Sequence, residues 1–172
     1  MACTASIPEG LIALKLPGDP EKGVLRYREE VRHPALPFPK IARGTWQLNS
    51  EGDLIRHQET PEVEFVEIGE TVLRIRKGED GEPNMLPIPA QMKDLFALLR
   101  NVASQDDRTM QFEDGAVREP DPAGWRMQFA VYEDQSTIWL LGCESRLSGF
   151  MIRNADGIER RTLFELVEGT SE

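Results

Sequence analysis

Few residues in this chain are of the types that carry out acid–base, nucleophilic or metal chemistry. Its two histidines are His33, which precedes Pro34, and His57, which lies in an alternating segment typical of a strand. A zinc site takes four nitrogen, sulfur or oxygen ligands, so both rings would have to meet and recruit carboxylates. The acids Glu29 and Glu30 are neighbours, and neighbouring strand residues point to opposite faces of a sheet. We therefore predict neither a metal site nor a catalytic pair of carboxylates.

The longer catalytic motifs are missing as well. The sequence has no Gly-x-Ser-x-Gly elbow, no phosphate-binding loop and no His-Glu-x-x-His pair. A further run of polar residues, Gln105-Asp106-Asp107, is typical of a turn. We predict that the protein is not an enzyme, that it needs no cofactor, and that it works as a binding scaffold.

Most of the chain alternates apolar and polar residues with a period of two. Such alternation places one side of each strand on a core or cavity and the other side in water. Strands are predicted near residues 24–32, 42–49, 53–59, 62–68, 71–77, 108–113, 124–132, 136–143, 146–153 and 158–167. Turn signals rich in Gly and Asn separate many of these segments at the spacing of an antiparallel meander.

One segment follows a helical period instead. After Pro89, which suits a first helical turn, apolar residues recur at Met92, Leu95, Phe96 and Leu99. This spacing predicts an amphipathic helix over residues 89–103. Two interpretations stay open: the helix fills the core of the sheet, or it is a lid over a ligand cavity.

Length and charge exclude some classes of function. With 172 residues, the chain is long enough to bury a sizeable core, and we expect one domain over residues 1–172. The net charge of -10, from 30 acidic against 20 basic residues, repels a phosphate backbone, so we predict no nucleic-acid partner. No run of about 20 apolar residues is present to span a membrane.

The N-terminal segment leaves the compartment open. Residues 1–6 lack the charged and apolar regions of a secretion signal, which fits a cytoplasmic protein or a mature exported protein behind a new Met1. Cys3 and Cys143 could pair in an oxidising compartment or stay as two thiols in a reducing one. Residues 7–22 could form a short helix or an extended arm.

Several segments follow one another in the order known from a protein family. They are Tyr27–Glu29 followed by a proline-rich loop, Gly44–Leu48, Leu54–Arg56, Thr60–Glu64, Phe112, Gly124–Phe129, Leu141–Gly142 and Asp156–Arg160. This series resembles the periplasmic lipoprotein carriers of the LolA-like family over about residues 24–167. The resemblance implies a mainly β (α+β) fold: an incomplete, strongly curved antiparallel β-barrel with a helical lid on its concave face. It also implies a location in the periplasm.

The resemblance further implies an apolar cavity that holds acyl chains. We expect its lining to comprise Trp46, Leu48, Val63, Phe65, Leu73, Ile75, Met92, Phe96, Leu99, Trp125, Met127 and Phe129. Carriers of this family latch the lid with an arginine, for which Arg43 and Arg56 are the candidates. Residues 1–22 would form an N-terminal arm that is too short for the long first helix of the family.

The expected function is that of a monomeric periplasmic carrier or chaperone. It would shield the acyl chains of a lipoprotein or a lipid-linked molecule during transfer towards the outer membrane. An inner-membrane donor and an outer-membrane acceptor would be its further partners. The alternative is a non-catalytic β-scaffold for protein–protein interaction, in which the same apolar residues form a solid core.

Overall fold

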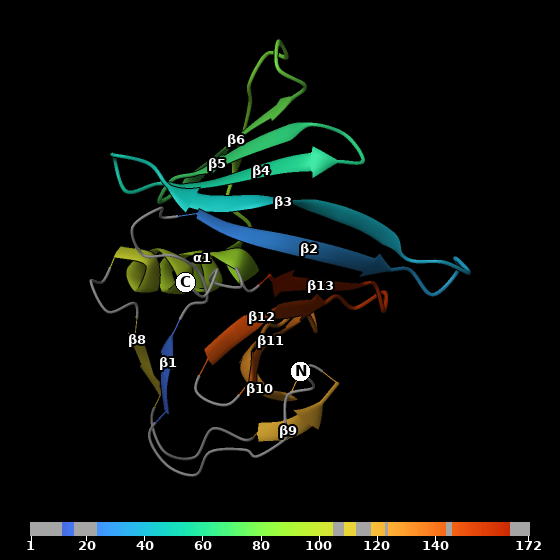
Figure 1. The fold of residues 1–172 in the computed structure, drawn as a ribbon. Helices are drawn as coiled ribbons and strands as arrows, with labels where there is room; N and C mark the ends of the chain where they lie inside the picture. The colour runs from blue at the N-terminus through green and yellow to red at the C-terminus, as the bar shows by residue number, and fades with distance from the viewer. Residues whose placement is uncertain are drawn as a thin grey trace, which may run out of the picture.

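The structure, a computed structural model, describes residues 12–15, 24–104, 109–112, 118–122, 124–143 and 146–165. Most of these residues form one antiparallel sheet (Figure 1). In spatial order its strands are β7 (Asn84–Pro87), β6 (Val72–Lys77), β5 (Glu64–Ile68), β4 (Leu54–Thr60), β3 (Lys40–Leu48), β2 (Val24–Arg32), β13 (Glu159–Phe164), β12 (Arg146–Arg153), β11 (Thr137–Cys143), β10 (Gly124–Val131) and β9 (Arg118–Asp121). Two short strands lie off this path, because β1 (Ile12–Lys15) pairs with β8 (Thr109–Phe112) and, in parallel, with β12.

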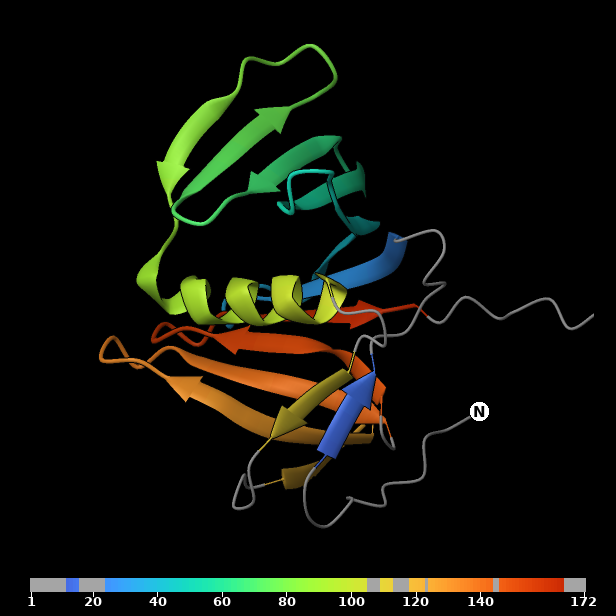
Figure 2. The ribbon, with the colours of Figure 1, turned by 90° about the vertical axis from the view of Figure 1, so that its left-hand side faces the viewer.

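The sheet is open and curves around one helix. Within the described residues, β7 and β9 are the two ends of the strand order and do not pair with each other. The helix α1 (Ala90–Ser104) crosses the concave side of the sheet, between the β3–β7 half and the β10–β13 half (Figures 1 and 2). The predicted fold class is therefore confirmed: the protein is an incomplete, curved antiparallel barrel with a helix on its concave face.

The hydrophobic core lies between this concave face and α1. Residues directly opposite each other on neighbouring strands share a face, and the register pairs Leu25 with Trp46 and Met127 with Leu140. The Trp46 ring makes an edge-to-face contact with Tyr27 at 6.3 Å between ring centroids. The buried core comprises Leu25, Tyr27, Trp46, Leu54, Val66, Ile68, Ile88, Leu95, Phe96, Leu99, Trp125, Met127, Ile138, Leu140, Leu147, Phe150 and Phe164.

Most of the predicted elements lie within a few residues of their expected positions, but β7 and β9 are not predicted by the sequence. Every residue of β7 is exposed, and β9 reads Arg118-Glu119-Pro120-Asp121 without an apolar residue. Period-two alternation arises only where one face of a strand is buried, so such edge strands carry no signal. Of residues 7–22, Ile12–Lys15 form a strand, as the extended alternative predicted, and the remainder lies outside the described residues.

Asparagines shape two of the predicted turns. The Asn154 Oδ1 atom accepts hydrogen bonds from the backbone N–H groups of Asp156 (3.1 Å) and Ile158 (3.0 Å). Gly157 then takes a φ of 77°, a left-handed conformation that favours glycine. Asn49 makes the same pair of bonds at the turn between β3 and β4.

Two expectations that bear on the compartment of the protein, one on its cysteines and one on membrane spans, can be compared with the structure. Cys143, at the end of β11, is disulfide-bonded, so the alternative of two free thiols is wrong, while Cys3 lies outside the described residues. Among the described residues, α1 is neither long nor apolar enough to cross a bilayer.

Candidate ligand-binding face

The concave face of the sheet, with α1 over it, brings together most of the residues predicted to line a cavity. Five of them are buried in the core: Trp46, Phe96, Leu99, Trp125 and Met127. Five more are partly buried and pack against that core: Leu48, Leu73, Ile75, Met92 and Phe129. The remaining two, Val63 and Phe65, are not part of this cluster. Whether the ten clustered residues bind a ligand stays a prediction.

Phe65 lies on the outer face of the sheet, opposite to the predicted orientation. Val66 and Ile68 of β5 point to the core instead, and Val63 precedes the strand. The segment from Val63 to Ile68 has apolar residues in both alternating series, so its pattern fits either face. A shift of one residue in this choice reverses every side chain of the strand, and only packing decides it. Val66 and Ile68 are therefore core residues that the sequence analysis missed.

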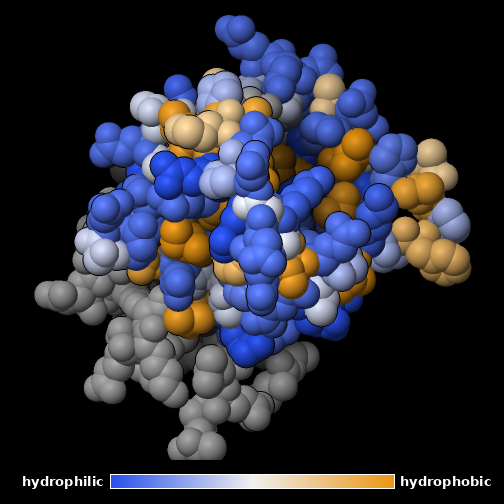
Figure 3. Space-filling model, turned by 90° about the horizontal axis from the view of Figure 1, so that it is seen from above, coloured by the Kyte–Doolittle hydropathy of each residue, from blue (hydrophilic) through white to orange (hydrophobic). Residues whose placement is uncertain are grey.

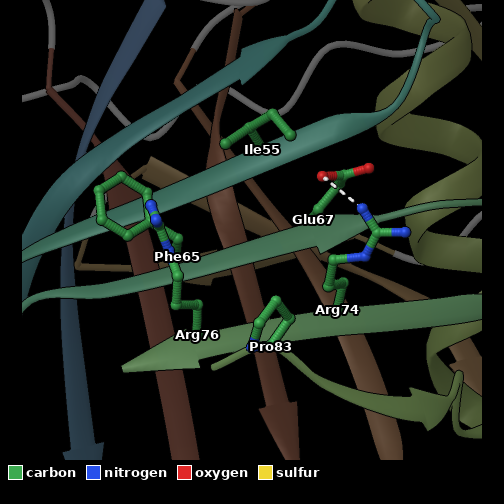
Figure 4. Close-up of a pocket in the computed structure, with 6 residues that line it drawn as sticks. All are labelled: Ile55, Phe65, Glu67, Arg74, Arg76 and Pro83. Carbon is green, nitrogen blue, oxygen red and sulfur yellow. Dashed lines mark ion pairs between the residues drawn. The ribbon is translucent and has the colours of Figure 1, made fainter. Parts of the chain in front are cut away.

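The outer face around Phe65 forms a shallow pocket of about 280 Å³ (Figure 4). His57 stacks on the Phe65 ring at 4.3 Å between centroids, and the Arg76 guanidinium lies over the same ring at 4.4 Å. Arg74 pairs with Glu67 at 3.8 Å at one side of the pocket. These contacts follow from the register, which sets His57, Phe65 and Arg76 side by side on β4, β5 and β6.

The apolar concave face continues from the core to the open edge of the sheet. Ile68 is buried, its neighbour Leu73 on β6 is partly buried, and Leu86 on β7 is 42% exposed. Leu86 shares the concave face because it stands directly opposite Leu73. Together with Ile75, these side chains form a strip whose exposure increases towards β7. Leu86 lies in the edge strand that the sequence did not predict.

A buried polar cluster, with residues from β2, β4, β5 and β13, interrupts the apolar face. Arg56, which is 8% exposed, donates from Nη2 to Glu29 Oε1 (3.3 Å) and from Nη1 to Glu64 Oε1 (3.2 Å). The second Glu29 oxygen accepts a hydrogen bond from the Thr162 hydroxyl at 3.3 Å, and Arg160 lies 3.7 Å from Glu29. Every carboxylate in this cluster thus has a cationic partner, as buried charges require.

The Arg56 guanidinium also lies over the Tyr27 ring, 5.1 Å from its centroid. It can do so because Gly44 stands between Tyr27 and Gln58 in the strand register and offers no side chain there. A Cβ at Gly44 would collide with the backbone carbonyl oxygen of His57, where the pairing of β3 and β4 shifts register. Gly44 is therefore the residue that permits this contact.

Two buried donors in the same region have no hydrogen-bond partner in the part of the chain that the structure describes. Neither the Tyr27 hydroxyl nor the Trp46 indole N–H makes a hydrogen bond among the described residues. Burial raises the pKa of the Tyr27 hydroxyl to about 12, and the neighbouring Arg56 charge opposes that rise. Unsatisfied buried polar groups are rare in native proteins and mark places where water or a ligand completes the bonding.

The helix is joined to the sheet by an arginine other than the two predicted latch residues, Arg43 and Arg56. Arg100 of α1 donates from Nη2 to the backbone carbonyl oxygens of Ile68 (3.1 Å) and Gly69 (2.7 Å). Arg56, one predicted latch residue, instead bonds acids of the sheet, and Arg43, the other, is exposed. No sequence pattern identifies Arg100 as a latch residue, because its partners are backbone atoms.

No family model matches the sequence, and no curated protein sequence matches it significantly. Among solved structures, the chain is similar to the crystal structure of a LolA superfamily protein from Nitrosomonas europaea. The two share 10% sequence identity and a TM-score of 0.47, over 94% of this chain and 86% of that chain. Membership of the carrier family stays a prediction at this level of similarity. The architecture described above rests on strand order and register.

Other surface features lie away from the concave face. A pocket of about 450 Å³ on the outer face of β2 and β13 shares Arg32 and Glu159 with a second pocket of about 320 Å³ under the β2–β3 loop. This loop carries Leu36 and Phe38, which is 80% exposed, and forms the orange group at the right of Figure 3. A group of acids brings one carboxylate oxygen each within 4.8 Å: Glu51, Asp53 and Glu67. Exposed acids of this kind are common without a bound ion.

Proposed function

We propose that the protein is a non-catalytic carrier that holds the apolar chain of a lipid or lipoprotein on its concave face, next to α1. The observation that supports this most is the graded exposure of the concave face. Its apolar surface runs without a break from buried Ile68, through partly buried Leu73, to exposed Leu86 at an open sheet edge. A chain could enter at this edge and continue towards the core beside α1.

The energetics of such binding need no specific polar motif. Removing apolar surface from water contributes roughly 25 cal/mol per Å², so about 400 Å² of buried alkyl chain would contribute about 10 kcal/mol. Ordering of the chain and the protein offsets part of this, which leaves room for micromolar affinity, about -8 kcal/mol. An apolar face that can open beside the helix is therefore sufficient for a carrier.

We further propose that the protein works in the periplasm and transfers its cargo towards the outer membrane. The disulfide at Cys143 supports an oxidising compartment, because disulfides persist there and are rare in the cytosol. The donor and the acceptor of the cargo would then be membrane-bound proteins on either side of this compartment.

A second function is favoured by a different observation. Leu95, Trp125, Ile138 and Leu140 are completely inaccessible to solvent. A core packed to this degree is also what a β-scaffold for protein–protein interaction needs, without any ligand. Such a scaffold would use its outer surface, and α1 would stay in place.

The two functions are distinguished by lipid binding. The carrier predicts that native mass spectrometry or lipid extraction of the purified protein finds bound acyl chains. It also predicts that a fluorescent fatty acyl probe binds with micromolar affinity. Ile75→Trp, which fills the partly buried strip, should weaken probe binding about tenfold or more, or about 1.4 kcal/mol. Val131→Trp is the matched control, because Val131 is an exposed apolar residue at the end of β10. Absence of bound lipid and of probe binding would favour the scaffold.

A further inference from the structure

Two neighbouring strands present unused hydrogen-bond donors to the concave face. Tyr27 on β2 is 1% exposed and Trp46 on β3 is 6% exposed, and their rings meet edge to face. The Tyr27 hydroxyl and the Trp46 Nε1–H lack a hydrogen-bond partner among the described residues. An indole N–H can only donate, and a hydroxyl donates as well as accepts. A ligand that completes both groups must therefore offer an acceptor oxygen.

The charges around these donors determine which acceptor fits. The cations Arg56 and Arg160 face the acids Glu29 and Glu64, and every one of the four is engaged in an ion pair with another. A further carboxylate would approach two acids without a spare cation, and an unpaired charge in an apolar site is costly. A carbonyl oxygen accepts the same hydrogen bonds and brings no charge.

We propose that Tyr27 and Trp46 bind the carbonyl oxygen of a neutral acyl ester or amide, in preference to the carboxylate of a free fatty acid. The acyl chain then runs from this carbonyl over the apolar concave face towards α1. This inference rests on the proposed function, which it deepens by naming the head group that the face selects. Ester- and amide-linked acyl chains are the forms found on glycerolipids and on acylated proteins, whereas free fatty acids carry the excluded charge.

The hydroxyl of Tyr27 can be removed with little risk to the fold. Because this hydroxyl has no hydrogen-bond partner among the described residues, Tyr27→Phe keeps the ring contacts with Trp46 and Arg56 and breaks no hydrogen bond of that part of the chain. Trp139→Phe is the matched control, since the Trp139 Nε1–H likewise lacks a hydrogen-bond partner among the described residues, while Trp139 alternates with the core residues Ile138 and Leu140 on β11 and so lies on the outer face. Trp46→Phe tests the second donor, and its thermal melt shows whether the variant remains folded.

The experiment uses dansylundecanoic acid and its methyl ester, two probes that share the fluorophore and the alkyl chain and differ at the head group, which is an anionic carboxylate in one and a neutral methyl ester in the other. Fluorescence titration of the wild-type protein at neutral pH should give an ester affinity at least about tenfold above that of the acid. Tyr27→Phe should weaken ester binding about tenfold, equivalent to about 1.4 kcal/mol, and acid binding much less. Trp139→Phe should bind both probes as the wild type does. Glu29→Gln, which removes one of the facing negative charges, should raise acid affinity relative to ester affinity.

The outcomes separate this inference from the proposed function. If the wild type binds the acid as tightly as the ester, or if Tyr27→Phe and a folded Trp46→Phe both leave ester binding unchanged, the assignment of the carbonyl site is overturned and the carrier function stands. If the wild type binds neither probe and carries no lipid on purification, both the carrier function and this inference are overturned.

Discussion

Arg100 in α1 and Gly69 in the turn after β5 are joined by a 2.7 Å hydrogen bond from the guanidinium to the backbone carbonyl oxygen. The same guanidinium nitrogen reaches the carbonyl oxygen of Ile68, the last residue of β5. On the other side of the helix, the hydroxyl of Tyr132, just beyond β10, donates to Asp94. The helix is thus fastened to both halves of the sheet through side chains, while its own backbone stays outside the strand pairing. Such a helix can move away from the sheet without breaking the ladder.

Arg100→Met should loosen the fastening of α1 to β5. Loss of hydrogen bonds from a charged group costs about 1.5–3 kcal/mol, which lowers Tm by several degrees in a protein of this size. We also expect faster release of a bound fluorescent acyl probe in stopped-flow experiments. Lys93→Met, at an exposed helical position, is the control. Equal melting temperatures and equal release rates in the two variants would show that Arg100 does not hold the helix.

Phe96→Asp should strongly destabilise the protein or abolish ligand binding. Phe96 lies on the side of α1 that is buried in the core, and an unpaired carboxylate there adds a desolvation cost to the loss of the ring. We expect a loss of about 4 kcal/mol or more in the free energy of unfolding, measured by urea titration. Lys93→Asp on the exposed side of the helix should change it by less than about 0.5 kcal/mol. Similar losses in both variants would contradict the observed orientation of the helix.

Gly44→Ala should destabilise the sheet where β3 and β4 shift register. The added methyl group would overlap the His57 backbone carbonyl, and a strand backbone cannot move aside as a flexible side chain can. The expected loss is about 3 kcal/mol or more, since overpacking against a fixed neighbour costs at least 1–3 kcal/mol. Gly69→Ala is the comparison, because a Cβ there meets its nearest neighbour at 3.4 Å, an ordinary contact. Chemical denaturation of both variants would reveal the difference, and equal stability would argue against the register shift.

Stability should fall as the pH rises from 10 to 12, because burial raises the Tyr27 pKa from 10.0 to about 12. Below pH 10, Tyr27 keeps its proton in the folded and the unfolded chain, so this group causes no change. Above it, the unfolded chain loses the proton while the folded protein retains it, which favours unfolding. Urea titrations across this range should show a smaller loss for Tyr27→Phe than for the wild type. An identical pH dependence would mean that the hydroxyl titrates normally.

The positions of the elements were predictable because their signals are local. Alternation over a few residues is enough to indicate β2, β3 or β10, and one run of helical spacing after Pro89 indicates α1. These periods follow from backbone geometry alone and do not depend on what a strand or helix packs against. The signal fails for β7, whose residues are all exposed, and for β9, whose sequence Arg118-Glu119-Pro120-Asp121 has no apolar–polar alternation.

The composition of the polar cluster was not predictable. Glu29 and Thr162 are 133 residues apart in the sequence, and they meet because β13 pairs with β2. Glu29 and Arg56 lie on strands separated by β3, so their contact needs two further pairings to be in register. No short sequence motif predicts these contacts, because each of the residues taken alone is an ordinary polar residue in a strand.

Local patterns in the sequence are enough to place most strands, the turns and the helix, because backbone propensity and hydrophobic period act within a few residues. Tertiary packing selects the side of β5 that faces the core, since Val63–Ile68 fit both faces and the outcome depends on packing against β4 and β6. It also placed Arg56 over Tyr27 and left the Tyr27 hydroxyl and the Trp46 N–H without partners among the described residues. These contacts depend on the register of strands that are distant in sequence, which is fixed by the free energy of the whole fold.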